Sequence, residues 1–539
     1  MDNQRLVWLL IFSFSLIMLW EAWHKPAPVA PTPPANVAQG AVPNLPQPSA
    51  PPLDLPQPTA TLPGTPAQSV GGAATMSVIT DLYHARISSL GGDLVRLELT
   101  RHGSAEDRHR PFVLFDERHA YAAQSGLIGS GLPNHRSIWQ LPAEESRLAD
   151  GENELRVRLT ARTEDGRSVA KIFRFQRDSY LIEVEYELPD EPATGTWAYF
   201  QLQRDDAPPE GSSFMMPTYT GPAFYSEQEK YQKLDFHDVL EGKAKHVRRA
   251  DNGWVAMVQH YFVSAWLPGG QVEREFYSRK LGDRLIAAGV LVPVRSKSVM
   301  VPLYAGPQEQ AKLEKIAPGF DLVVDYGWLT VIAAPLFWLL EGMHALTGNW
   351  GWAIILMTVL IKLAFFPLSA ASYKSMAKMR VLTPKLMQLK ETYGNDRMRL
   401  NREMMDLYKR ENVNPLGGCL PILIQIPVFI ALYWVLLGSV EMRQAPWLGW
   451  VDDLSAKDPY FILPLVMGVT MYVQMKLNPP PPDPIQAKIL MMMPIIFTAM
   501  FLFFPSGLVL YWTVNNLLSI AQQWQINRMI EAAEGGGKR

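Results

Sequence analysis

The chain has 539 residues and a net charge of −2 at pH 7; 48% of its residues are hydrophobic and 19% are charged. Its single cysteine, Cys419, excludes an internal disulfide framework and argues against a cysteine-based metal cluster. The near balance of charge carries no signal of nucleic-acid binding, and we expect no DNA partner. The average hides two unlike halves, since residues 73–318 read as water-soluble whereas residues 321–528 are dominated by apolar runs.

Residues 1–25 predict an N-terminal transmembrane anchor. Leu6–Trp23 is apolar, follows Arg5 and is long enough to span a bilayer. A cleaved signal peptide is the alternative, but the long apolar run and the tryptophans near both of its ends favour a retained anchor. Residues 26–70 are rich in Pro, Ala and Gln, which predicts an extended linker.

Residues 71–318 predict a β-sandwich of many short strands. Alternating apolar runs flank a turn at Asp178, and similar runs recur over Asn153–Arg162, Gly195–Arg204, Trp254–Leu267 and Ile286–Tyr304. Such a domain can bind sugar, and the side chains that offer an acid–base pair are Asp205, Asp206 and Glu210, or His237 and Asp238. Carboxylates in loops beside Pro and Gly are usually solvated turns, so we expect no enzyme here.

The sequence shows no glycine-rich phosphate loop that opens a helix and no HExxH motif. We therefore expect no cofactor and no metal, and no work driven by ATP hydrolysis in this chain.

Beyond residue 318 the candidate membrane helices are six apolar runs, at Tyr326–Leu346, Trp350–Leu368, Leu416–Leu437, Tyr460–Met475, Ile489–Phe504 and Leu508–Gln523. Ser372–Asn414, between the second and third runs, carries ten basic and five acidic residues. The positive-inside bias places this segment in the cytoplasm.

That orientation decides the predicted topology. With the N-terminus inside and the β domain outside, Trp350–Leu368 must run inward, so Tyr326–Leu346 is expected to lie at the outer interface as an amphipathic helix. Together with the anchor this gives six spans and two cytoplasmic termini. The predicted units are an interfacial helix, a five-span core, a cytoplasmic helical hairpin within it and a short cytoplasmic tail, at residues 319–348, 349–530, 370–415 and 531–539.

Lys362 lies inside an apolar run, where a charge costs about 2.5–3.5 kcal/mol on insertion scales. Two interpretations remain open: the ammonium faces a hydrated groove, or it reaches the cytoplasmic interface by snorkelling. Other spans carry polar residues that can face it, namely Thr358, Gln425, Thr470, Gln474, and a stripe on one helix face at Tyr511, Asn515, Ser519 and Gln522. The alternative for these residues is hydrogen bonding that holds the helices together.

The cytoplasmic segment predicts a basic, methionine-rich helical hairpin. Thr383 and Pro384 are typical of a helix start, and Gly394 begins the turn to a second helix. The side chains we expect to make contacts are Lys374, Lys378, Arg380, Lys385, Met387 and Met404. Their basic face suits ribosomal RNA or anionic lipid, and ordinary packing of the hairpin is the alternative.

Several longer motifs resemble one known family. They include Asn414–Cys419, Leu423–Pro427, Gly438–Glu441, Arg443–Pro446 and Phe504–Trp512. In order and over essentially the whole chain, they are similar to the YidC/Oxa1/Alb3 family of membrane protein insertases, in the form found in Gram-negative bacteria.

The resemblance implies a multi-domain protein of the bacterial inner membrane: an all-α core of five helices, an N-terminal anchor helix and a large periplasmic β-supersandwich similar to galactose mutarotase. It implies a hydrophilic groove open to lipid and cytoplasm and closed toward the periplasm. Lys362 stands where the family usually has Arg, which keeps the charge but not the bidentate fork. Thr358, Tyr511 and Trp512 match groove positions.

The resemblance also implies the partners: nascent membrane-protein substrates, the Sec translocon with its accessory subunits, membrane lipids and, weakly, the ribosome. Substrates are expected to slide along apolar faces of the third and fifth of the six spans, at Ile426, Phe429, Ile430, Ile496, Phe497 and Met500. A small-solute channel or transporter, or a membrane-anchored sugar enzyme, remains the alternative.

Overall fold

The computed structural model describes residues 73–105, 107–209, 219–394, 396–411, 420–477 and 484–536. The predicted anchor, the whole of the predicted linker and Cys419 lie outside these residues. All the described residues fall within one compact unit, residues 58–539.

The predicted β domain is confirmed. Its described strands are β1 Thr75–Ile79, β2 Tyr83–Ser88, β3 Leu94–Gly103, β4 Pro111–Phe115, β5 Ala122–Ile128, β6 Glu145–Arg147, β7 Glu154–Arg162, β8 Ser168–Gln176, β9 Leu181–Glu187, β10 Trp197–Asp205, β11 Gly221–Ser226, β12 Lys230–Lys233, β13 Arg249–Ala250, β14 Trp254–Val258, β15 Phe262–Trp266, β16 Arg274–Lys280, β17 Leu285–Pro293 and β18 Ser298–Pro307. Two short helices accompany them, α2 Phe236–Leu240 and α3 Gln310–Ile316.

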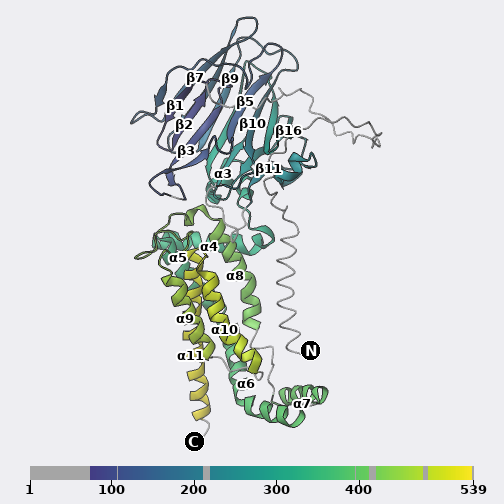
Figure 1. Cartoon of the computed structure of the whole chain (residues 1–539), viewed down its shortest axis with the longest axis vertical. Coiled ribbons are helices and arrows are strands. Elements are labelled where there is room, and N and C mark those ends of the chain that lie inside the picture. The colour runs from purple at the N-terminus through teal and green to yellow at the C-terminus, as the bar shows by residue number, and fades with distance from the viewer. Residues whose placement is uncertain are drawn as a thin grey trace, which may run out of the picture. The chain divides into compact units, whose positions relative to one another are not determined.

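The strands form two sheets (Figure 1). A 10-stranded sheet has the order β13-β16-β17-β10-β5-β3-β2-β1-β6, with β4 paired to β3, and an 8-stranded sheet has the order β12-β11-β14-β15-β18-β9-β8-β7. The predicted hairpin at Asp178 joins β8 to β9, and Asp178 has a φ of 56°. Aspartate tolerates this left-handed conformation better than most residues, which explains the turn.

The helical part begins with two 3-10 turns and continues with long helices. Their bounds are η1 Phe320–Val323, η2 Gly327–Leu329, α4 Thr330–Thr347, α5 Trp350–Ala364, α6 Phe366–Tyr393, α7 Arg397–Arg410, α8 Leu420–Gly438, η3 Val440–Met442, α9 Ile462–Leu477, α10 Pro484–Phe501 and α11 Ser506–Gly536. Helices α9, α10 and α11 run side by side (Figure 1). Helix α11 continues well past Gln523, where the last apolar run ends.

Helix α5 and the first part of α6 are bent by 62° at a break after Ala364. Pro367 lies in the first turn of α6, where its missing N–H is not needed, so it suits the start of a new helix. The prediction that a helix starts at Thr383 and Pro384 is wrong, because α6 runs through both. Leu382 and Leu386, one turn apart, are both 3% exposed, and this continuous packed face holds the helix together across the proline.

Among the described residues, one helix is long and apolar enough to cross a membrane by itself, Thr330–Thr347. The bent pair of α5 and the start of α6 passes the same test if taken together, while the apolar parts of α8, α9 and α10 are shorter. The charge bias instead predicts that α4 lies at the interface. Its exposed side chains include the apolar Val331, Trp338 and Leu346 as well as Glu341, so its exposed surface is largely apolar.

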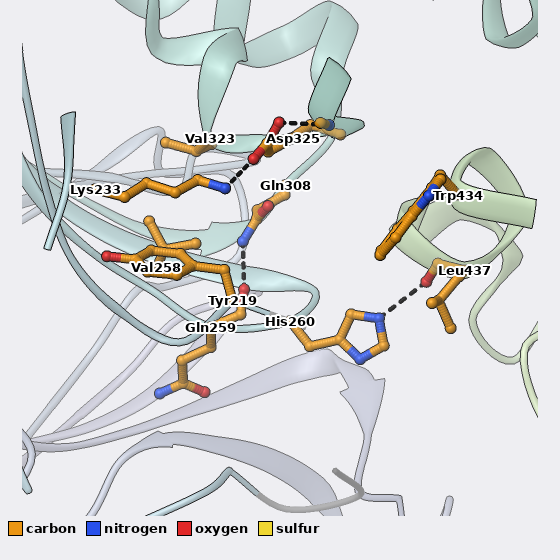
Figure 2. Close-up of a pocket in the computed structure, with 13 residues that line it drawn as sticks. Tyr219, Lys233, Val258, Gln259, His260, Gln308, Val323, Asp325, Trp434 and Leu437 are labelled. Atoms are coloured by element: carbon orange, nitrogen blue, oxygen red, sulfur yellow. Dashed lines mark hydrogen bonds and ion pairs between the residues drawn. The ribbon is translucent and has the colours of Figure 1, made fainter. Parts of the chain in front are cut away.

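The β domain and the helical part meet where α8 ends. Figure 2 shows a pocket at this junction, with Lys233 and Asp325 paired on one side and Trp434 and Leu437 of α8 on the other. The imidazole of His260, from the turn between β14 and β15, reaches across to α8.

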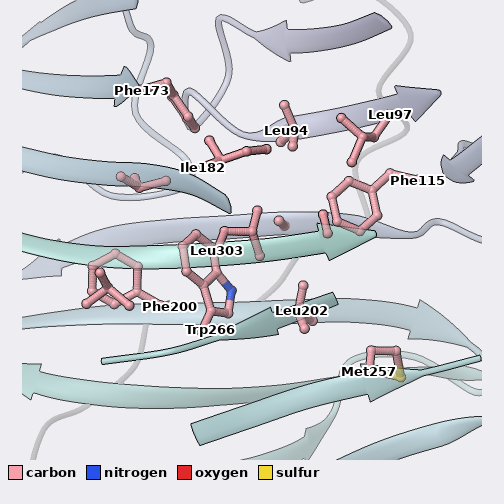
Figure 3. Close-up of a cluster of buried hydrophobic side chains, with 14 of the residues drawn as sticks. Leu94, Leu97, Phe115, Phe173, Ile182, Phe200, Leu202, Met257, Trp266 and Leu303 are labelled. Carbon is pink, nitrogen blue, oxygen red and sulfur yellow. The ribbon is translucent and has the colours of Figure 1, made fainter. Parts of the chain in front are cut away.

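Two hydrophobic clusters hold the described residues together. One fills the space between the sheets and includes Leu94, Phe173, Phe200 and Trp266 (Figure 3). The other begins on the outer side of the 8-stranded sheet and continues through η1 and η2 into α4, α5, α8 and α11. Buried apolar side chains are therefore continuous from the β domain into the helices. Each Å² of apolar surface buried in this way contributes about 25 cal/mol to stability.

Candidate functional site

Helix α11 is the centre of the helical part, and it packs against α5, α6, α8 and α9. Contacts fix the relative directions of these helices. Asn516 pairs with Thr470, and Gln523, seven residues later, pairs with Leu477, seven residues after Thr470, so α9 runs parallel to α11. Gln425 pairs with Asn515 and Phe429 with Tyr511, so α8 runs antiparallel to it. These directions are those that the predicted alternation of spans requires.

Lys362 reaches α11 from the last turn of α5. Its Nζ donates to Oγ of Ser519 at 2.8 Å, and this hydroxyl in turn donates to the Asn515 carbonyl at 2.8 Å. Gln522 Nε2 donates to the Lys362 carbonyl at 3.4 Å. Carbonyls in the last turn of a helix lack partners within the helix. The Gln522 amide of α11 provides the hydrogen bond that the Lys362 carbonyl lacks at the end of α5.

Gln425 joins the same cluster from α8, and its Nε2 donates to Oδ1 of Asn515 at 2.5 Å. Lys362 and Gln425 also line one pocket, together with Ile361, Phe365, Leu368, Ser369 and Val428. Within the described part of the chain, no carboxylate oxygen lies within 4.0 Å of Lys362 Nζ. The pocket therefore offers a cation and an amide on a wall that is otherwise mainly apolar.

Three predicted groove residues lie elsewhere. Thr358 is fully buried, and its hydroxyl donates to the Ile354 carbonyl at 2.6 Å, within its own helix. Thr470 donates to the Met467 carbonyl at 2.7 Å and accepts from Asn516. Gln474 is half-buried on α9 and does not line the pocket of Lys362. Thr470 thus links α9 to α11. This agrees with the alternative interpretation of the polar residues, in which they hold the helices together by hydrogen bonds.

Tyr511 and Trp512 belong to an aromatic cluster. Phe429 lies 6.2 Å from Tyr511 and 4.5 Å from Trp512, measured between ring centroids, and Phe497 lies 6.0 Å from Trp512. Tyr511 is 1% exposed. The six residues of the predicted apolar slide therefore divide: Phe429 and Phe497 cover these aromatics, Ile430 and Met500 are half-buried, and Ile426 and Ile496 are 46% and 54% exposed.

Four polar residues near the site were not identified from the sequence, namely Asn516, Gln523, Ser369 and Tyr373. Asn516 and Gln523 are seven apart, so they mark a second polar face of α11, toward α9, that the single stripe from Tyr511 to Gln522 overlooked. Ser369 and Tyr373 belong to α6, which brings them beside the pocket only because the chain bends after α5.

The hairpin of α6 and α7 exposes most of its predicted contact residues. Lys374, Lys378, Lys385 and Met387 are exposed, and Met404 is half-buried. Lys385 donates to Glu411 at 2.7 Å. The side chain of Arg380 lies outside the described residues.

Three of the candidate acid–base residues of the β domain are engaged with other side chains, and Asp238 is exposed. Asp205 lies 3.1 Å from His119, Asp206 pairs with Arg284, and His237 pairs with Glu241. Glu210 lies outside the described residues. In the described part of the chain no group of His, Cys, Asp and Glu is arranged to hold a metal ion.

Comparisons with known proteins cover both halves of the chain. A family model described as YidC periplasmic domain matches residues 75–339, and one described as 60Kd inner membrane protein matches residues 342–533. The membrane protein insertase YidC of Aromatoleum aromaticum is 59% identical over 552 residues, which cover 100% of both chains. That of Dechloromonas aromatica is 56% identical over 557 residues, covering 100% of this chain and 99% of the relative.

A solved structure of an active YidC insertase, with its first transmembrane domain resolved, is 19% identical and has a TM-score of 0.39, covering 83% of this chain and 92% of that chain. The 59% and 56% identities to the two relatives, over the full length of this chain, are enough to assign the family. This chain belongs to the YidC family of membrane protein insertases.

Proposed function

We propose that this chain inserts nascent inner-membrane proteins through the pocket of Lys362 and Gln425, and helps them to fold. The observation that carries the proposal is the Lys362 ammonium, which has hydrogen-bond partners on α11 but no carboxylate within 4.0 Å in the described residues. A cation inside an apolar helix is costly and usually functional. An acidic segment of a substrate is the natural missing partner.

In this proposal the polar flank of a nascent segment enters the pocket from the cytoplasm. Lys362 attracts its carboxylates, while the Gln425 amide provides hydrogen bonds in place of water, so the flank avoids the hydrocarbon. The apolar segment moves along Ile426 and Ile496 into lipid. Partition of apolar surface drives the step, and the membrane potential assists the transfer of charge.

The exposed basic side chains of the hairpin support part of the proposed set of partners. The basic hairpin of α6 and α7 contacts the nascent chain and, weakly, the ribosome. The periplasmic β domain contacts accessory subunits of the Sec translocon, so insertion proceeds alone or with that translocon. We further propose six spans with both termini in the cytoplasm, α4 lying at the outer interface.

Charge reversal tests the role of Lys362. In Lys362→Glu, insertion of a substrate with an acidic periplasmic tail is expected to fall about tenfold or more, because a charge-assisted hydrogen bond worth about 1.5–3 kcal/mol is replaced by repulsion. Lys362→Arg is the matched control and keeps insertion close to the parent. The measurement is protease protection of the translocated tail in inverted vesicles.

A second substrate, with its tail carboxylates replaced by amides, separates the charge effect from misfolding. It is expected to insert equally well with the parent and with Lys362→Glu. Equal insertion of the acidic substrate by both proteins would rule out the proposed role of Lys362.

A further inference from the structure

The loop between α8 and α9, residues 439–461, lies at the level where three helices begin. Trp447 of this loop packs against the start of α5, with its ring centroid 5.8 Å from that of Trp352. The Ala456 carbonyl accepts from the Ser506 N–H, at the start of α11, at 2.7 Å. The loop itself ends where α9 begins. Because α5, α9 and α11 belong to the proposed membrane spans, this loop lies where they leave the hydrocarbon, at the depth of the lipid headgroups.

The exposed side chains of the loop are those that membrane interfaces favour. Trp450 and Tyr460 are 37% and 67% exposed, and Leu448 and Phe461 are 57% and 38% exposed. Trp and Tyr are enriched where a bilayer meets water, because their rings are apolar and their polar atoms reach the headgroups. These four side chains therefore suit contact with lipid.

A pocket with a volume of about 520 Å³ is formed by this loop and one residue of the β domain. Pockets for small ligands typically measure about 300–1,000 Å³. The lining residues that matter for its chemistry are Arg108, Trp450, Asp452, Asp453, Lys457 and Tyr460. The pocket thus combines charges of both signs with two aromatic rings of the interfacial type.

The four charged side chains balance, with two cations and two carboxylates. Arg108, from the loop that follows β3, pairs with both acids: its Nη1 lies 3.0 Å from Oδ2 of Asp452, and its Nη2 lies 3.3 Å from Oδ2 of Asp453. Oδ1 of Asp453 also accepts from the Ser455 N–H at 2.8 Å. These contacts hold the two carboxylates in place and leave the pocket without net charge.

Asp452 and Lys457 remain available to a ligand. The side chain of Asp452 is 65% exposed although it contacts Arg108. Lys457 is exposed, and among the described residues no carboxylate oxygen lies within 4.0 Å of its Nζ. A ligand that satisfies both side chains carries an ammonium for the carboxylate and an anionic group for the lysine. A purely anionic ligand would be repelled by Asp452.

We propose that this pocket binds the headgroup of phosphatidylethanolamine. The primary ammonium of the lipid donates to Asp452, its phosphate accepts from Lys457, and its glycerol and acyl chains pass Trp450 and Tyr460 toward the bilayer. Phosphatidylcholine has no N–H to donate, and phosphatidylglycerol has no cation, so neither satisfies both side chains. The inference goes beyond the proposed insertion activity, and it rests on the proposed topology rather than on the pocket of Lys362.

The test uses the full-length chain in vesicles of equal parts phosphatidylethanolamine, phosphatidylglycerol and phosphatidylcholine. A benzophenone amino acid replaces Tyr460, which keeps an aromatic ring there, and mass spectrometry identifies the lipids that it captures on irradiation. Adducts of phosphatidylethanolamine are expected to exceed those of phosphatidylcholine about threefold, as suits a partly exposed ion pair. The control probe at position 469, where Val469 is 63% exposed on α9, is expected to capture the three lipids in equal parts.

Two variants test the assigned contacts. Asp452→Asn and Lys457→Gln are each expected to bring phosphatidylethanolamine adducts at position 460 down to the level of phosphatidylcholine, since each removes one of the two charges. Lys457→Arg keeps the charge and is expected to keep the excess. An unchanged yield of adducts at position 469 checks that each variant is folded and embedded in the bilayer.

Every other result counts against the inference. Equal yields of the three lipids at position 460, or an excess of phosphatidylglycerol, contradict it, and so does an excess of phosphatidylethanolamine that persists in Asp452→Asn or Lys457→Gln. Absence of adducts at position 460 beside strong ones at 469 means that the pocket lies away from lipid. Insertion of the acidic-tail substrate is measured in the same vesicles, and its failure beside an intact lipid preference would count against the proposed function alone.

Discussion

Lys171 and Asp93 illustrate how single residues govern stability in the β domain. Their side chains are 1% and 4% exposed, and Nζ of Lys171 lies 3.6 Å from Oδ1 of Asp93. Lys171 also donates to the Gly91 carbonyl at 3.1 Å. Two charges withdrawn from water are tolerated only as a pair, so each one depends on the other.

Removal of one partner is therefore expected to be costly. Asp93→Ala should lower the free energy of unfolding by about 3–5 kcal/mol, because it leaves the Lys171 ammonium buried without its carboxylate. The double variant Asp93→Leu with Lys171→Met should recover most of this loss. Hydrogen exchange of the β8 amides measures both, and equal protection in the parent and in Asp93→Ala would show that the pair does not contribute.

At the level of residues, part of the candidate site could be predicted from the sequence. Lys362 was identifiable because a charge in an apolar run needs a partner, and Asn515, Ser519 and Gln522 because they share one face of a helix. Thr358 was misleading: a threonine hydroxyl can bond to a carbonyl of its own helix, as it does with Ile354, and then needs no groove. Asn516 was missed because the rotation of α11 against α9 depends on packing between helices.

Among the helices, α5 depends on one close contact at its start. A Cβ atom added at Gly351 would lie 2.1 Å from Cδ1 of Trp447 and 2.6 Å from its Cβ, so the indole or the helix must shift. Gly342 in α4 has no neighbouring atom within 4 Å of the same position. The two glycines thus form a matched pair, one at a tight contact and one in open space.

Gly351→Ala is accordingly expected to destabilise the helical part by about 1–3 kcal/mol, as overpacking does. Gly342→Ala should be neutral or stabilising, since Ala is favoured over Gly within a helix by about 1 kcal/mol. Thermal unfolding in detergent compares the two variants. Equal midpoints for both would mean that α5 and the loop of Trp447 are less closely packed than the contact indicates.

The elements themselves were predicted where their signals are local. The β8–β9 hairpin follows from alternation around Asp178. The relative directions of α8, α9 and α11 agree with those predicted from the charge of the loops. The bend after Ala364 was not predicted, although Pro367 is typical of the first turn of a helix. The sequence pattern predicted a helix start at Pro384 instead, and Pro384 lies inside α6. The order of strands in the two sheets could not be predicted, because it depends on pairings between distant segments.

For the whole molecule, buried neutral histidines predict sensitivity to acid. Burial lowers the pKa to about 4 for each of four imidazoles, those of His102, His135, His246 and His260. In the unfolded chain their pKa is about 6.5. Between these values the unfolded state binds protons that the folded state does not, so stability present above pH 6.5 is lost as the pH falls toward 4.

Thermal unfolding of the full-length chain should therefore show a midpoint that falls between pH 6.5 and pH 4. His246→Gln is expected to make the midpoint depend less on pH, because the side chain at this position then no longer titrates. A difference of one pKa unit between the folded and unfolded states corresponds to about 1.4 kcal/mol of stability. An unfolding midpoint that is constant across this range would contradict the burial of these histidines.

The central claim is that a nascent segment passes the pocket of Lys362 and Gln425 on its way into lipid. Site-specific photocrosslinking to a stalled nascent chain tests it most directly, with the probe at positions 425, 430 and 497 and a control at position 469, where Val469 is 63% exposed on α9. We predict strong crosslinks from the first three positions and weak ones from the fourth. Crosslinks of equal yield from all four, or from position 469 alone, would contradict the account.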